Sequence, residues 1–200
     1  MEYRLASSKG HAEHHNPGPI NQLGFWLFLI SDCLLFASIF ACYAILNTHT
    51  DGGQGAKELF DVPIFVTETF LLLTSSFTSG LAMLALQKGK KAALLNWLVI
   101  TAILGAGFIG LEVSEFANLV ADGATISRSA FLTSFFTLVG THGCHVTFGL
   151  IWMITLMVQI KKRGINAKTT NKVGLFSLYW HFLDAIWIFI FSVVYLMGVM

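Results

Sequence analysis

Apolar residues gather into five long runs along this chain, and polar residues are concentrated between the runs. The runs cover about residues 23–46, 62–86, 92–113, 131–159 and 175–199. A helix needs about 20 predominantly apolar residues to cross roughly 30 Å of hydrocarbon, and each run is long enough. The pattern predicts an all-α integral membrane protein with five transmembrane helices. We expect residues 1–21 to form a polar tail and residues 22–200 to form a single transmembrane domain.

Composition supports this fold class. Hydrophobic side chains make up 55% of the residues and charged side chains only 12%, and the mean hydropathy is +0.70. These values lie outside the usual range of soluble globular domains. Because the few charges fall between the apolar runs, no basic face is available for nucleic acid, and we expect no nucleic-acid partner.

The distribution of basic residues predicts the orientation in the membrane. Lys and Arg in short connections are retained on the cytoplasmic side. Ten of the 12 Lys and Arg residues lie in the tail or in the second and fourth connections, and only Lys57 and Arg128 lie in the others. We therefore expect a cytoplasmic N-terminus and, after five crossings, a C-terminus outside.

Two further patterns concern packing. Small residues recur four positions apart at Ser75 and Ser79 and at Ser76 and Gly80, which lets helix backbones approach one another in lipid. Near predicted cytoplasmic ends, where an interfacial belt of aromatic residues is expected, lie Trp26, Trp97, Tyr179 and Trp180.

Ionisable side chains inside the apolar runs are the candidate functional residues, because each costs several kcal/mol in hydrocarbon unless it is paired or hydrated. They are Asp32, Glu68, Glu112, His142, His145, His181 and Asp184.

His181 and Asp184 lie one helical turn apart and share a face. They form either a pair that handles protons or contacts a ligand, or a structural pair that holds the last helix to a neighbour. His142 and His145 lie at i and i+3 beside Cys144. They serve either in interhelical hydrogen bonds or as part of a haem or metal site, which would need further ligands at matching depth on facing helices.

The carboxyl groups leave alternatives open as well. Asp32 has no cation within one turn, so it is either protonated or answered by a partner chain or a lipid headgroup. Its role is either a proton path or lipid cleft, or structural. Glu68 and Glu112 are expected to share a proton across two helices, and Glu115 to lie solvated at the membrane rim. No nucleophile stands beside a base and no phosphate-binding loop is present, so we do not expect catalysis from this chain alone.

Four motifs resemble subunit III of the haem–copper terminal oxidases. They are LGFWLFLISD at 23–32, GAGFIGLE at 105–112, VGTHGCHV at 139–146 and YWHFLDAIW at 179–187. The resemblance runs from about residue 20 to the C-terminus. It implies a subunit of a bacterial plasma membrane that has no cofactor of its own. Such a subunit packs on subunit I, which carries haem and copper, and assembles with subunits II and IV.

The same resemblance implies bound phospholipid in a cleft between helices 1–2 and the remaining bundle. In members with seven helices a buried Glu lies near this lipid, and the matching position here is Asp32, whose side chain is shorter. Residues 31–33 and 68–73 look more like the quinol-oxidising branch, of the bo type and the bacillus aa type.

We therefore expect an accessory, non-redox subunit III of a proton-pumping quinol:oxygen oxidoreductase. The alternatives are subunit III of a cytochrome c oxidase, or a small membrane transporter or proton channel. A transporter is expected to show inverted repeats or broken half helices, which this sequence lacks.

Overall fold

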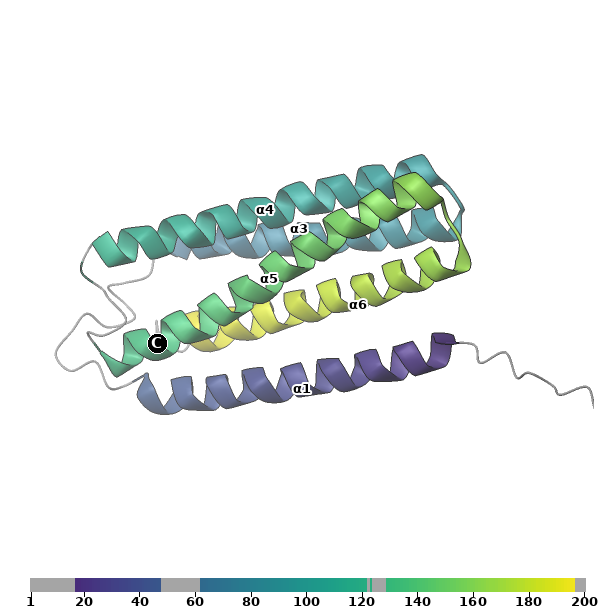
Figure 1. The fold of residues 1–200 in the computed structure, drawn as a ribbon. Coiled ribbons are helices and arrows are strands. Elements are labelled where there is room, and N and C mark those ends of the chain that lie inside the picture. The colour runs from purple at the N-terminus through teal and green to yellow at the C-terminus, as the bar shows by residue number, and fades with distance from the viewer. Residues whose placement is uncertain (1–16, 48–61, 122, 124–128, 197–200) are drawn as a thin grey trace, which may run out of the picture.

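The computed structural model describes residues 17–47, 62–121, 123 and 129–196. These residues form five long helices and a π-helical segment (Figure 1). The elements in chain order are α1 (Pro17–Leu46), α3 (Val62–Gln87), α4 (Lys91–Ala121), α5 (Ala130–Arg163), α6 (Ala167–Ile190) and η1 (Phe191–Leu196). Each of the five helices is long and apolar enough to cross a membrane, which confirms the predicted fold class.

Several helices extend beyond the apolar runs that predicted them. The helix expected to end at residue 113 continues to Ala121, and the helix expected to begin at 175 begins at Ala167. Apolar runs mark the limits of the hydrocarbon, whereas the helix ends are set by local capping. The side chain of Asn166 accepts a 2.9 Å hydrogen bond from the Thr169 amide at the start of α6, and Gly164 ends α5 with a φ of 70°.

Helices α3, α4, α5 and α6 form a four-helix bundle, and α1 packs at its side (Figure 1). Within the bundle, α3 contacts α4 and α6, and α5 contacts the same two helices. α1 packs on α5 and α6 through a narrow stripe of buried residues, whose described members are Leu29, Asp32, Phe36 and Tyr43. The first helix is therefore a satellite of the bundle.

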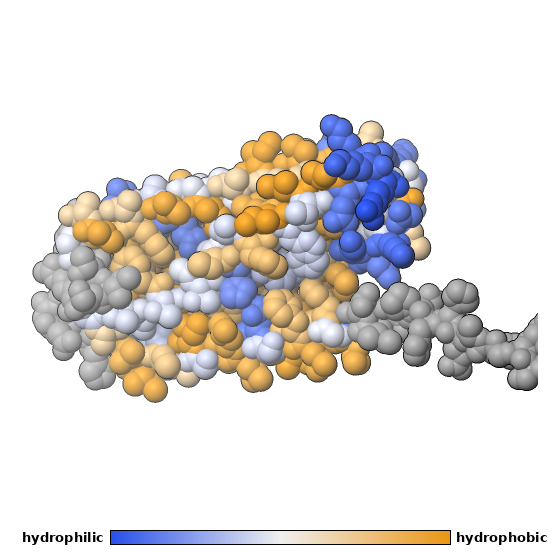
Figure 2. Space-filling model, viewed as in Figure 1, coloured by the Kyte–Doolittle hydropathy of each residue, from blue (hydrophilic) through white to orange (hydrophobic). Residues whose placement is uncertain are grey.

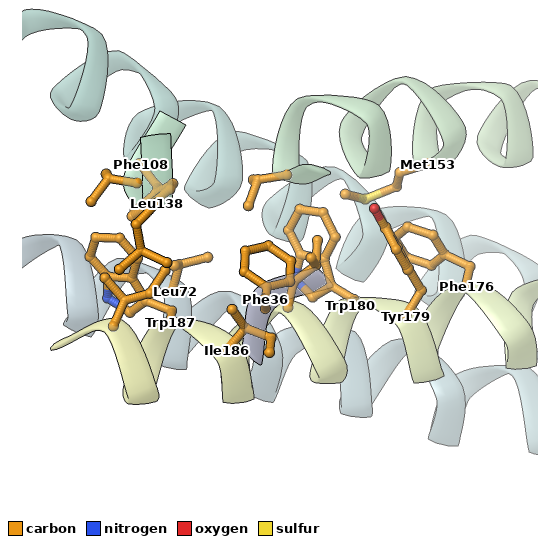
Figure 3. Packing of buried hydrophobic residues seen from close by; sticks show 14 of the residues in the cluster. Phe36, Leu72, Phe108, Leu138, Met153, Phe176, Tyr179, Trp180, Ile186 and Trp187 are labelled. Atoms are coloured by element: carbon orange, nitrogen blue, oxygen red, sulfur yellow. The ribbon is translucent and has the colours of Figure 1, made fainter. Parts of the chain in front are cut away.

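Trp180 occupies the centre of the bundle and contacts its other three helices (Figure 3). A Cβ atom added at Gly105 of α4 or at Gly149 of α5 would lie 3.0 Å from the indole, so both glycines make room for it. Tyr179 and Trp180 are both buried, with exposed fractions of 0% and 2%. The expectation that they belong to an interfacial belt was wrong, because α6 begins before 175 and carries them deep into the bundle.

All Lys and Arg residues in the described ranges lie at one end of the molecule. There, α3 and α5 end and α4 and α6 begin, and α1 starts at the same end (Figures 1 and 2). At this end the Lys91 ammonium donates a 3.1 Å hydrogen bond to the Lys161 carbonyl, tying α4 to α5. Lys57 and Arg128 lie outside the described residues, as do residues 1–16 of the expected tail; residues 17–21 of that tail are helical. The orientation in the membrane stays a prediction.

Candidate functional site

The polar side chains inside the bundle form a set of bridges between helices, and one of them holds α1. His145 Nε2 on α5 lies 3.2 Å from Asp32 Oδ1 on α1. The other ring nitrogen, Nδ1, lies 2.7 Å from the carbonyl oxygen of Thr141, which can only accept, so Nδ1 carries a proton. Asp32 therefore has a partner within its own chain for Oδ1, whereas its Oδ2 atom has no hydrogen-bond partner in the described ranges. A protonated carboxyl group and a contact with a partner chain or lipid headgroup both stay predictions.

This geometry fixes the protons of the pair. Since Nδ1 is protonated, a neutral His145 has its lone pair on Nε2 and must accept a hydrogen bond from a protonated Asp32. If Asp32 is ionised, Nε2 must carry the proton and donate it. In both forms one proton lies between Nε2 and Oδ1 and the pair is neutral overall. This neutrality suits a pair inside the membrane, where an unpaired charge is costly.

The same turn of α5 is joined to α6. The Tyr179 hydroxyl donates a 3.1 Å hydrogen bond to the His145 carbonyl oxygen. The ring of Phe36 packs against the His145 imidazole at a centroid distance of 5.3 Å. Residues of α1 and α6 thus both contact His145 of α5.

A second set of bridges runs between α6 and α3. The indole N–H of Trp180 donates to Ser75 Oγ at 2.9 Å, and that of Trp187 donates to Thr69 Oγ1 at 3.1 Å. One residue further along each helix than the Trp180–Ser75 bond, His181 Nδ1 lies 2.7 Å from Ser76 Oγ. The serines that the sequence indicated only as small packing residues are therefore also hydrogen-bond partners, because α6 places donors opposite them.

Ser76, His181 and Asp184 lie together on the α3–α6 side of the bundle, where they line one groove. Asp184 is buried, with Oδ1 lacking a hydrogen-bond partner in the described part of the chain, whereas the His181 ring is exposed. An open groove of about 440 Å³ lies beside these groups. It is lined by Leu73, Ser76, Phe77, Gly80, Leu81, Leu84, His181 and Asp184.

The remaining candidates form an acidic cluster beside a buried imidazole. Glu68 of α3 is fully buried and close enough to Glu115 and Glu112 of α4 for their charges to interact. Neither oxygen of Glu68 has a hydrogen-bond partner among the described residues, so the expected proton-sharing contact with Glu112 is not formed. Glu115 is buried rather than solvated at the rim, because α4 continues past it.

His142 is fully buried between aromatic rings. Its ring lies 5.3 Å from that of Trp187 and 5.9 Å from that of Phe108, and neither of its nitrogens has a hydrogen-bond partner in the described ranges. One residue along, Gly143 allows the Glu112 carboxyl group to approach α5, since an added Cβ would overlap that group. Glu112 and Gly143 also line an open groove of about 450 Å³ between α4 and α5.

Metal ligation would require three or more His, Cys, Asp or Glu side chains around one point. Within the described ranges no such group could hold a metal ion. The positions of the three imidazoles show how they are used instead. His145 uses both nitrogens in hydrogen bonds, His181 bonds to Ser76, and His142 lies among aromatic rings.

The model of the family described as cytochrome c oxidase subunit III matches residues 6–199, almost the whole chain. The chain belongs to this family.

The similarity to curated subunit III proteins extends over nearly the full length of both chains. The chain is 53% identical to cytochrome bo(3) ubiquinol oxidase subunit 3 of Pseudomonas aeruginosa, over 94% of this chain and 90% of the relative. It is 47% identical to quinol oxidase subunit 3 of Bacillus subtilis, over 94% of this chain and 97% of the relative. It is also 51% identical to cytochrome c oxidase subunit 3 of Bacillus sp. strain PS3, over 88% of this chain and 85% of the relative.

These comparisons confirm the resemblance to oxidase subunit III and the multi-pass location in a bacterial plasma membrane. One implied feature needs correction for this subunit III. A cleft between the first two helices and the remaining bundle requires those two helices to pack on each other and to be separated from the other helices. Here α3 packs on α4 and α6 inside the bundle, and α1 stands alone at the side.

Proposed function

We propose that this subunit III is an accessory, non-redox subunit of a proton-pumping quinol:oxygen oxidoreductase. The identities of 53% and 47% to subunits of two quinol oxidases, each over nearly the whole length of both chains, support the quinol-oxidising branch. In this complex subunit I carries the haem and copper, oxidises quinol and reduces oxygen. This chain contributes no cofactor and assembles with subunits I, II and IV and with phospholipid.

The accessory role is supported by the way in which the polar side chains are used. Three bridges join helices of the chain: Asp32 to His145 joins α1 to α5, and Ser76 to His181 and Ser75 to Trp180 join α3 to α6. Groups tied into such bridges fix helix positions, and a rigid bundle of this kind stabilises the subunit on which it packs. The expected contribution to the reaction is therefore the stability of subunit I and of its proton uptake.

Purification of the complex through a tag on this chain tests the proposal. Membranes solubilised in a mild detergent should yield a complex with haem absorbance that consumes oxygen when given quinol. Recovery of the chain as a homo-oligomer without haem would contradict an oxidase role and favour a transporter. Retention of haem by the chain after it has been separated from its partners would contradict the non-redox role.

Subunit III of a cytochrome c oxidase is the second candidate, because the relative from Bacillus sp. strain PS3 is 51% identical. Oxygen consumption with reduced cytochrome c and none with quinol would favour this candidate. A neighbouring gene for a second subunit that has a copper-binding motif would agree with that result.

A further inference from the structure

We infer that the groove between α3 and α6 receives a transmembrane helix of another oxidase subunit, which supplies a polar side chain to His181 and Asp184. This inference rests on the proposed function, since it assigns one contact face within the assembled complex. It starts from polar groups that the chain's own fold leaves incompletely satisfied.

The groove holds two such groups. Asp184 is nine-tenths buried, and its Oδ1 atom has no hydrogen-bond partner in the described chain. His181 uses Nδ1 for Ser76, and its exposed ring borders the groove. The groove therefore presents an incompletely satisfied carboxyl group and an exposed imidazole, and a polar side chain would complement both.

The depth of these groups excludes a lipid headgroup as the polar partner. His181 lies near the middle of the continuous helical stretch Ala167–Leu196, about 20 Å from either end by the rise per residue. Headgroups begin about 15 Å from the midplane of the bilayer, and acyl chains have no hydrogen-bond donor. A polar side chain on a membrane-spanning helix can reach this depth.

The shape of α3 fits the same occupant. Ser76 and Gly80 are small residues four positions apart and line the groove. A Cβ atom added at Gly80 would meet no heavy atom within 4 Å, so packing within the described chain does not require a glycine there. Small residues at this spacing allow another helix to approach closely. Phe77, which is 67% exposed beside them, can cover the side of that helix.

Photo-crosslinking within the intact complex tests this assignment. Benzoylphenylalanine is placed at Phe77 in one variant and at Ile103 in a control. Ile103 is 66% exposed on α4 and lies at a similar distance from the lysine-rich end. We expect a covalent adduct with a second membrane subunit from position 77, in clear excess over position 103. An adduct with lipid or with a second copy of this chain, or equal yields from both positions, would overturn the inference.

A second measurement places a larger side chain in the groove. Gly80→Leu should lower the haem recovered with the tagged chain about tenfold, the size expected from over-packing one contact. Gly110→Leu is the control, because a Cβ atom at Gly110 also meets nothing within 4 Å. Equal recovery from both variants would overturn the assignment of this face. Absence of haem with the unmodified chain would instead contradict the proposed function, so the two failures are distinguishable.

Discussion

His145 Nε2 lies 3.2 Å from Asp32 Oδ1, and these two residues join α1 to the bundle across 113 positions of sequence. Because one proton lies between them, Nε2 of His145 and Oδ1 of Asp32 each depend on the other for a hydrogen bond at this contact. Because α1 has just a narrow buried stripe, the pair is an important part of its attachment.

Replacement of Asp32 should reveal this attachment. Asp32→Ala leaves Nε2 of His145 without a partner, and we expect a loss of about 1–3 kcal/mol in the free energy of unfolding. Asp32→Asn keeps one hydrogen bond, because its amide can donate to Nε2, so its loss should be smaller. Thermal unfolding of the complex in detergent measures both losses. Oxygen consumption per haem should stay near the wild-type value in Asp32→Asn, and total loss of activity in an assembled complex would contradict a structural role.

The effect of a glycine-to-alanine substitution on stability should depend on the space around that glycine, and Gly105 beside Trp180 has little. Gly105→Ala places a methyl group 3.0 Å from the indole, so over-packing should destabilise the bundle by about 1–3 kcal/mol. Gly24→Ala on α1 meets nothing within 4 Å and should be neutral or slightly stabilising, since alanine is the better helix former. Equal melting temperatures for the two variants would contradict the central position of Trp180.

The contact between Gly143 and Glu112 should show compensation. Gly143→Ala alone should destabilise the protein, because its Cβ atom overlaps the Glu112 carboxyl group. Truncation of that side chain in the double variant Gly143→Ala, Glu112→Ala removes the overlap. We expect the double variant to be more stable than the sum of the two single effects by about 0.5–3 kcal/mol. Additive effects in detergent unfolding would show that the two positions are not in contact.

The orientation predicted from the basic residues can be measured by labelling. In a background without the native cysteines, Lys90→Cys lies at the lysine-rich end and Ala121→Cys at the opposite end. A maleimide that cannot cross membranes should label position 121 in intact spheroplasts and position 90 only after the membrane is inverted. The reverse labelling would place the N-terminus outside.

Helix number was predictable because it depends only on the length of apolar runs. Helix ends were harder to predict, since Glu115 and the residues just after Asn166 are polar but remain helical. The ionisable residues inside the apolar runs include those of the bridges, but not Glu115 of the acidic cluster, and the sequence could not assign their partners.

The partners depend on how each helix is rotated, and apolar residues on every face of a membrane helix leave no stripe that reveals the rotation. Asp32 was recognised as isolated within its own turn, yet its partner lies on α5. Ser76 was recognised as small, while its bond to His181 depends on the packing of α6 against α3. Such contacts become visible only when the helices are placed in space.

The wide separation of Asp32 and His145 also has a consequence for synthesis. At about 5–20 residues per second, a ribosome needs roughly 6 to 23 seconds to add the 113 positions that separate them. During this interval α1 enters the membrane without the imidazole that later binds its carboxyl group. The closing of this pair therefore waits for α5 and marks a late step in the maturation of the subunit.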